Sequence, residues 1–136
     1  MTTRTGADGR RQVLDPVRRR WVALTPEEGV RQALLRDLLA LGYPAGLLAV
    51  ERAVVYAGQT WRADVVAYGR AGGAVLLAEC KAPGVALAQA TLDQLARYNA
   101  VVGAATLVLD NGRQRVAVGR VAGGWAVLDA LPPFAG

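Results

Sequence analysis

The sequence predicts a single α/β domain in which a mixed β-sheet lies between helices, a three-layer α/β/α arrangement with the element order α-β-β-β-α-β-β. Three observations support this fold class. Residues 25–41 combine a helix start signal with helical spacing of apolar residues. Three short apolar runs joined by glycine-containing turns follow. A second helical segment, residues 87–102, is long enough to connect two parallel strands.

The first helix begins at a capping box. Thr25 is the expected N-cap, Pro26 occupies the first helical position and Glu28 stands at N3. Apolar residues then recur at helical spacing up to a stop at Gly42-Tyr43-Pro44. They are Val30, Leu34, Leu35, Leu38, Leu39 and Leu41.

Strands are predicted on both sides of the second helix. The first three are expected at about residues 48–56, 61–68 and 74–81, and the connections between them are short and contain glycine, as in hairpins. After the helix we expect strands at residues 106–109 and 115–120, and a last edge strand at residues 125–128.

Composition indicates one globular domain with a basic charge. The chain has 136 residues, a 53% hydrophobic fraction and a formal net charge of +5. Residues 1–20 are polar and arginine-rich, so we expect a flexible basic tail there and one domain over residues 21–136. Neither a signal peptide nor a membrane-spanning run is found, and we expect a cytoplasmic protein. The high charge is typical of proteins that bind polyanions, and equally of a GC-rich genome.

Several kinds of catalytic site are excluded by what the chain lacks. It contains no histidine, no serine and a single cysteine, Cys80, which removes Ser-His and Cys-His catalysis and imidazole or multi-cysteine metal sites. No phosphate loop ending in Gly-Lys-Ser/Thr is present, so we expect no use of ATP. Carboxylates remain as metal ligands, and they favour hard cations such as magnesium or manganese. Fifteen of the 16 basic residues are arginine, and the lone lysine, Lys81, suggests that this position needs an amine.

Two carboxylates are expected to face each other across the second hairpin. If its turn is centred between residues 71 and 72, paired residues have numbers that add up to 143, which sets Asp64 opposite Glu79. Lys81 follows two residues later on the same face. Like charges placed in this way repel unless a cation or a proton lies between them.

Asp64, fourteen intervening residues and then Glu79-Cys80-Lys81 resemble the PD-(D/E)XK nuclease superfamily. The surrounding motifs are similar to the N-terminal nuclease domain of type I restriction enzyme R subunits and its stand-alone relatives, over about residues 20–120. One departure is Ala63, where the superfamily often has proline. A second is that no helicase follows, so no ATP-driven translocation is expected. The motifs that carry the resemblance are Thr25-Pro26-Glu27-Glu28, Gly42-Tyr43-Pro44, Arg62-Ala63-Asp64, Glu79-Cys80-Lys81-Ala82-Pro83 and Asp93-Gln94-Leu95-Ala96-Arg97-Tyr98-Asn99.

The resemblance implies a restriction-endonuclease-like core and a metal-dependent nuclease that acts on nucleic acid, with DNA favoured and a restriction or repair role. Asp64 and Glu79 would ligate Mg²⁺, for which Mn²⁺ can substitute, and the backbone carbonyl of Cys80 would complete the set. Lys81 would orient the attacking water or stabilise developing charge. The resemblance also implies site roles for Gln94 and Tyr98 from the second helix and for Glu28 from the first. The candidate nucleic-acid contacts are Arg31, Arg62 and Arg97.

Simpler interpretations stay open at this point. The acidic hairpin can be a solvated face, the capping box explains Glu28 fully, and Gln94 and Tyr98 can serve packing alone. A structural role is favoured for Glu51, and the arginines at 18–20 can contact phosphates or keep the tail soluble. The alternative functions are a catalytically silent nucleic-acid-binding or assembly module and a domain that binds a structural cation. Cutting a duplex further suggests a homodimer, since one such site serves one strand at a time.

Overall fold

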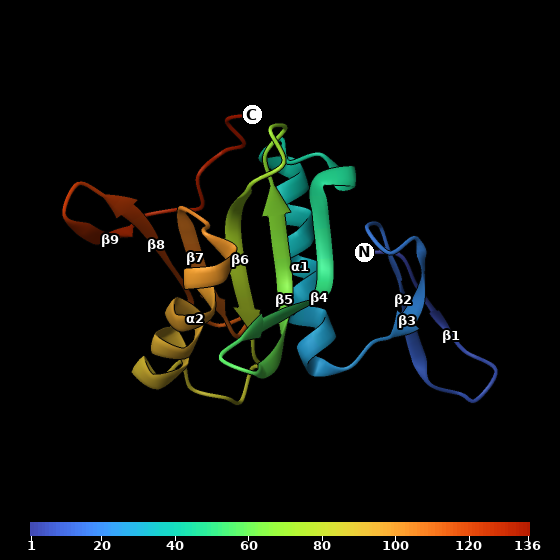
Figure 1. The fold of residues 1–136 in the computed structure, drawn as a ribbon. Coiled ribbons are helices and arrows are strands. Elements are labelled where there is room, and N and C mark those ends of the chain that lie inside the picture. Colours follow the sequence, from blue (N-terminus) through green and yellow to red (C-terminus); the bar gives the residue numbers. More distant parts are fainter.

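The computed structural model describes residues 1–136 and contains a six-stranded mixed sheet, a separate three-stranded sheet and two α-helices (Figure 1). The mixed α/β class predicted from the sequence is confirmed. In the N-terminal sheet the strands are β1 (Thr3–Thr5), β2 (Arg11–Asp15) and β3 (Arg20–Ala23). The remaining elements are α1 (Pro26–Ala40), the 3-10 turn η1 (Ala45–Leu47), β4 (Leu48–Tyr56), β5 (Gln59–Tyr68), β6 (Ala74–Cys80), α2 (Gln89–Val102), β7 (Thr106–Asp110), β8 (Arg115–Val121) and β9 (Gly124–Leu128).

Helix α1 begins as its capping signal predicts. The Thr25 side chain accepts a hydrogen bond of 3.1 Å from the backbone N–H of Glu28, and Pro26 occupies the first turn. The apolar stripe of the helix is buried, with Leu34, Leu35 and Leu38 fully excluded from solvent. The cap and the stripe together fix which residues of α1 point toward the sheet.

The central sheet has the strand order β4-β5-β6-β7-β8-β9. Only β6 and β7 are parallel, and α2 forms the crossover between them, as its predicted length indicated. The helix begins at Gln89, two residues later than predicted, and ends at Val102, as predicted. Gly103 follows as its C-cap, with a left-handed φ of 76°.

Two apolar clusters fill the space between the sheet and its helices. One joins α1 to β5 and β6 through residues such as Val65 and Ala78, and the other joins α2 to the same strands through Val66 and Leu77. These strand residues alternate along the chain, so the two helices cover opposite faces of the sheet. Strand β6, which leads to the candidate site residues, is therefore covered by α1 on one face and by α2 on the other.

Residues 1–20 differ from the flexible tail that the sequence predicts. They form β1 and β2 and lead into β3, in an antiparallel sheet that stands beside α1 (Figure 1). Val13 and Asp15 are completely buried, and the backbone N–H groups of Val17 and Arg18 donate to the Asp15 carboxylate. A polar composition suggested mobility, but a buried ion-pair network provides the anchorage that apolar residues would otherwise give.

No helix of this fold is long and apolar enough to cross a membrane.

Candidate active site

The two predicted carboxylates lie at the end of the β5–β6 ladder. The pairs Val65↔Ala78, Val66↔Leu77 and Ala67↔Leu76 have the register that the sequence predicts, and the ladder stops one residue before Asp64. A bulge between Ala67 and Tyr68 absorbs the irregularity near the turn. Asp64 therefore stands where β5 leaves its regular pairing, with its side chain free to contact a neighbouring element.

Both oxygens of the Asp64 carboxylate accept hydrogen bonds. The backbone N–H of Cys80 donates to Oδ2 at 2.7 Å, which ties Asp64 to the end of β6. The Arg31 guanidinium from α1 donates to Oδ1 at 3.3 Å. With only 9% of its surface exposed, Asp64 is positioned by one strand and one helix at the same time.

Lys81 lies beside Glu79 at the same strand end. Its Nζ is 3.4 Å from Glu79 Oε1, and the two side chains are 34% and 13% exposed. The backbone N–H of Lys81 donates to the carbonyl of Asp110 in β7 at 2.8 Å. This bond holds the chain beyond β6 against the sheet and keeps the ammonium near the carboxylates.

The electrostatics of the pair favour a bound cation or a proton. Burial raises the pKa of Glu79 to about 7, and the nearby charge of Asp64 adds to the rise while Lys81 opposes it. Burial also raises the pKa of Asp64, against the Cys80 N–H and Arg31. Neither local cation fully compensates two carboxylates that are removed from water, so a further positive charge would stabilise both.

Glu27, an exposed acid in the first turn of α1, acts on the electrostatics of the site, and the sequence analysis did not single it out. Its charge adds to the rise in the pKa values of both Asp64 and Glu79, behind the larger effect of their burial. Glu27 and Arg31 are four residues apart on α1 and so share a helix face. Once Arg31 is known to face Asp64, this spacing identifies Glu27 as its neighbour.

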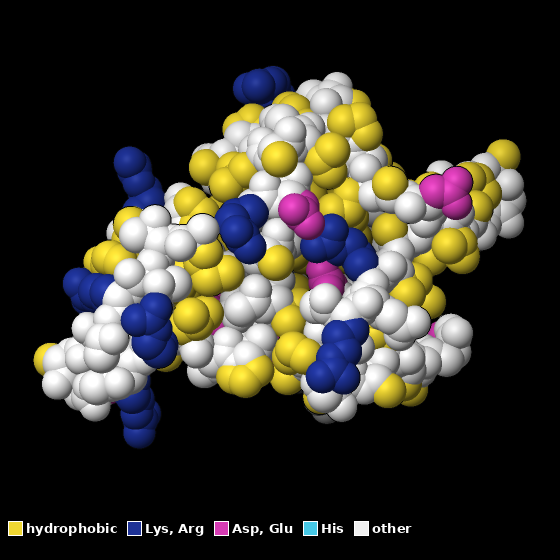
Figure 2. All heavy atoms as spheres, turned by 180° about the vertical axis from the view of Figure 1, so that it is seen from behind, with side chains coloured by type: hydrophobic (Ala, Val, Ile, Leu, Met, Phe, Trp, Pro, Cys, Tyr) yellow, Lys and Arg dark blue, Asp and Glu magenta, His cyan; other side chains and the backbone are white.

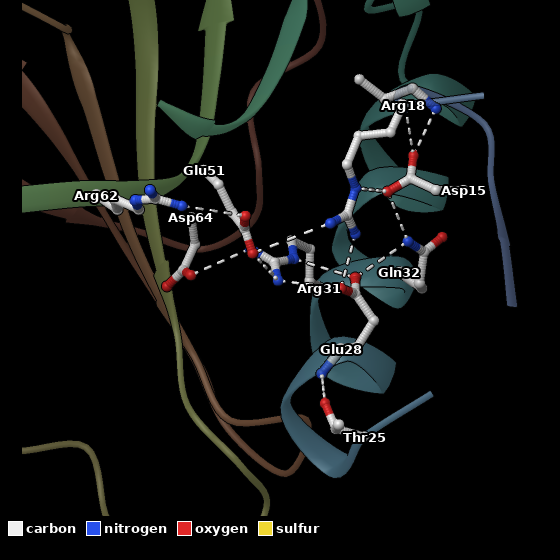
Figure 3. A network of polar contacts seen from close by, with 10 residues as sticks. Asp15, Arg18, Thr25, Glu28, Arg31, Gln32, Glu51, Arg62 and Asp64 are labelled. Atoms are coloured by element: carbon white, nitrogen blue, oxygen red, sulfur yellow. Dashed lines mark hydrogen bonds and ion pairs between the residues drawn. The ribbon is translucent and has the colours of Figure 1, made fainter. Parts of the chain in front are cut away.

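Glu28 lies in an ion network behind the site rather than facing the pair (Figure 3). Its carboxylate accepts from Arg31 at 3.0 Å and from Arg18 at 2.7 Å, and Gln32 adds a third contact. Burial alone would raise the pKa of Glu28, but the hydrogen bonds from Arg31 and Arg18 hold it below its usual value. The simpler interpretation was that the capping box explains Glu28 fully, but its side chain also holds Arg18 and Arg31. Glu28 acts on Asp64 only through Arg31.

Arg31 was predicted to contact nucleic acid, but the structure buries it. Only 6% of the residue is exposed, and its guanidinium is engaged with Glu28, Glu51 and Asp64. Four of its five N–H groups are engaged by these carboxylates, so the structure shows Arg31 holding acidic side chains. The other two predicted contacts, Arg62 and Arg97, are both exposed.

Glu51 joins this network from β4 with an unusual backbone. Its φ is +56°, a conformation that costs free energy in a non-glycine residue. The Glu51 carboxylate lies 3.3 Å from Arg31 and 3.7 Å from Arg62. The left-handed turn in the strand therefore brings a partly exposed acid to the edge of the site.

Gln94 and Tyr98 occupy α2 without a direct contact to the carboxylate pair. Gln94 is exposed. The Tyr98 ring stacks on Trp61 with centroids 4.5 Å apart and meets Tyr56 edge-on. Tyr98 thus packs against the β4–β5 hairpin, and its partner Trp61 lies three residues before Asp64 in β5. Its site role stays a prediction.

The oxygen donors at this site come from carboxylates of different elements. No group of three or more histidine, cysteine, aspartate or glutamate side chains is arranged to hold a metal ion. Asp64 and Glu79 are the two acids that most directly combine burial, proximity and a raised pKa. Cys80 contributes its backbone, because burial raises the pKa of its thiol well above the usual value and keeps it protonated.

Comparison with known proteins gives one match. No curated protein matches the chain, and neither does any solved structure. The family model described as type I restriction enzyme R protein N terminus matches residues 26–132, which span α1 to the segment after β9 and include every candidate site residue. The chain therefore belongs to the family of type I restriction enzyme R protein N-terminal domains.

Proposed function

We propose that this chain is a metal-dependent nuclease that hydrolyses phosphodiester bonds in nucleic acid, with DNA as the favoured substrate. The observation that carries the proposal is the buried pair of Asp64 and Glu79, whose mutual repulsion is only partly relieved by protein cations. Membership of a restriction enzyme family supports the same role. The proposal includes a restriction-endonuclease-like, three-layer arrangement around this strand end.

Mg²⁺ or Mn²⁺ fits the donor chemistry of the site. Asp64 and Glu79 supply carboxylate oxygens, and the Cys80 carbonyl stands between them in sequence. When bound, the ion supplies Lewis acidity to the phosphate and makes water a stronger nucleophile.

The protein residues have separate tasks in this proposal. Arg31 and the Cys80 N–H orient the Asp64 carboxylate, as their contacts of 3.3 and 2.7 Å indicate. The Lys81 ammonium is partly exposed beside Glu79, so a phosphate can approach it. Its task is to stabilise the negative charge that develops on the phosphate during hydrolysis. Arg62 and Gln94 are exposed and free to contact the substrate.

The test is a cleavage assay with supercoiled plasmid, single-stranded DNA and RNA in the presence of Mg²⁺, Mn²⁺ or EDTA. We expect wild-type cleavage that needs the metal and is abolished by Asp64→Ala and by Glu79→Ala. Asp129→Ala removes an exposed carboxylate outside the site and serves as the matched control. Tight nucleic-acid binding without cleavage of any substrate would identify a catalytically silent module. Equal cleavage by wild type and the two site variants would also reject the proposal.

A further inference from the structure

The basic charge of the chain is concentrated in its N-terminal sheet. Residues 1–23 contain six arginines and two aspartates, a net +4, whereas the other 113 residues contribute only +1 of the total of +5. The family match begins at residue 26, so this sheet lies outside the region that defines the family. Its charge therefore needs an explanation of its own.

Most of these arginines are available to a ligand. Five of the six are exposed and take part in no ion pair, namely Arg4, Arg10, Arg11, Arg19 and Arg20. Figure 2 shows Lys and Arg side chains projecting from the side of the molecule that the N-terminal sheet forms, on the left of that view. Asp15, one of the two acids, is buried and committed to Arg18, so it neutralises nothing on the surface.

Two of the exposed guanidinium groups are held in place before any ligand arrives. Arg4 lies over the Trp21 ring at 4.2 Å from its centroid, and its Nε donates to Gln12 at 2.7 Å. Arg11 donates to the hydroxyls of Thr3 and Thr5 on the neighbouring strand. Ordered arginines lose less conformational entropy when they bind, which favours recognition of phosphate.

The sheet is also connected to the candidate active site by a series of ion pairs. Arg18 donates to Asp15 at 2.6 Å and to Glu28 at 2.7 Å, and Glu28 in turn accepts from Arg31, the residue that holds Asp64 (Figure 3). This chain of contacts links the N-terminal sheet, through α1, to the Asp64 carboxylate. A ligand held by the sheet would therefore have a defined position relative to the site.

We infer that the β1–β3 sheet is a binding surface for the phosphate backbone of nucleic acid. Exposed arginines without carboxylate partners suit a polyanion with closely spaced phosphates, and binding gains free energy from released counterions. The sheet holds the nucleic acid beside the Asp64–Glu79 pair, and in this respect the inference rests on the proposed function. It reads no sequence, since backbone contacts position a duplex without specifying its bases.

The experiment compares two double variants of the full chain. Arg10→Gln/Arg20→Gln removes two charges from the N-terminal sheet, at side chains that make no hydrogen bond. Arg70→Gln/Arg120→Gln removes two exposed charges from the central domain, where these side chains lie over Phe134 and Trp125, and is the control matched in charge. Affinity for a fluorescent DNA duplex is measured by anisotropy in EDTA, so that binding is separated from cleavage, over about 50 to 200 mM salt. Circular dichroism verifies that each variant is folded.

We expect the N-terminal double variant to bind duplex more weakly and to lose about 2 from the slope of log K against log salt, while the control keeps the wild-type slope. An equal change in both variants would overturn the inference, because net charge alone would then explain binding. Loss of binding to anionic lipid vesicles with unchanged DNA binding would overturn it too. Cleavage with Mg²⁺ is scored separately. If the wild type cleaves DNA but the two double variants bind duplex equally well, the binding-surface inference is rejected and the proposed nuclease function is not. If the salt slopes are as expected but no cleavage is seen, the proposed nuclease function is rejected and the binding surface is not.

Discussion

At the residue scale, Lys81 is the position whose residue type is most informative about the proposed chemistry. Every other basic residue of the chain is arginine, and yet the position two residues after Glu79 has a compact ammonium. The structure sets that ammonium 3.4 Å from the Glu79 carboxylate and leaves it partly open to solvent. An arginine could form the same ion pair, so the pair alone does not explain the lysine. Under the proposed function, the lysine is explained by close approach of its ammonium to a phosphate and the attacking water.

Lys81→Arg separates catalysis from simple charge. The guanidinium is bulkier and planar, so we expect turnover of DNA to fall by about 10²–10³ while affinity at fixed salt changes little. Single-turnover cleavage and anisotropy measure the two quantities. Arg36→Lys, a reverse exchange at an exposed position, is the control. Activity within a few-fold of wild type would mean that the lone lysine reflects composition.

Glu79 gives the metal-free protein a pH dependence with a definite sign. Its pKa in the folded state is about 7, above the ordinary value of 4.5, so the folded protein binds this proton more tightly than the unfolded chain does. Ionised Glu79 therefore destabilises the fold above pH 7, and the penalty disappears as the pH falls toward 4.5. Glu79→Gln should raise the free energy of unfolding on the order of 2 kcal/mol at pH 8 and leave it unchanged near pH 4. Urea titrations at both values check this, with Asp129→Asn as control.

A divalent cation should reverse that penalty. Because Mn²⁺ binds the ionised carboxylates and competes with the proton, we expect it to raise the Tm of the wild type at pH 8 and to have little effect at pH 5.5. The Asp64→Asn and Glu79→Gln variants should show no such rise. Differential scanning calorimetry with and without Mn²⁺ measures it. Unchanged metal affinity in both variants, by isothermal titration, would remove these carboxylates from the metal site.

At the scale of elements, local sequence signals were sufficient to predict those helices and hairpins whose structure is determined by residues close together in sequence. The bounds of α1 were predicted to within a residue or so from the cap at Thr25 and the stop at Gly42. The glycine-containing turns predicted the hairpins of the central sheet with similar accuracy. The index sum of 143 gave the β5–β6 register. These features depend on neighbours in sequence, which a single chain displays directly.

Features that depend on distant partners could not be predicted in this way. Residues 1–20 were predicted to be a flexible tail because their anchorage is an ion network with α1, and no spacing rule links Arg18 to Glu28. The same holds for Arg31, which resembles any surface arginine until its three carboxylate partners are seen. Tyr98 depends on distant partners as well, because its stacking on Trp61 of β5 cannot be read from the motif that suggested a site role.

Arg18→Met tests the connection between the N-terminal sheet and α1. The change leaves buried Asp15 and Glu28 without their shared guanidinium, so we expect a loss of about 3 kcal/mol in stability. Hydrogen exchange should show faster exchange over β1–β3, and urea titration gives the free energy. Arg20→Met, at an exposed neighbouring position, should change neither measurement. Equal protection of the sheet in both variants would show that Arg18 is dispensable for docking.

At the scale of the whole molecule, the two edges of the central sheet differ. β4 forms one edge and carries Glu51, which pairs with Arg31 and Arg62 near the site, whereas β9 forms the other edge. Large apolar side chains are exposed on and beside β9, with Val127 77% and Trp125 43% exposed. An edge strand with exposed apolar side chains and unpaired backbone N–H and C=O groups can form hydrogen bonds with a strand of another molecule. A second copy of the same chain provides a strand of matching character.

We therefore predict a homodimer in which two β9 strands pair antiparallel across a two-fold axis. The physical reason is burial of Val127 together with completion of the backbone hydrogen bonds at the edge. Val127→Lys should convert the dimer to a monomer in light scattering, because a buried lysine pair is strongly unfavourable. Val55→Lys, at a 61% exposed position on β4, should leave the dimer intact. Since one carboxylate pair serves one strand at a time, the monomeric variant should nick plasmid DNA but lose most double-strand breaks. A strictly monomeric wild type that makes double-strand breaks in a single encounter would contradict the prediction.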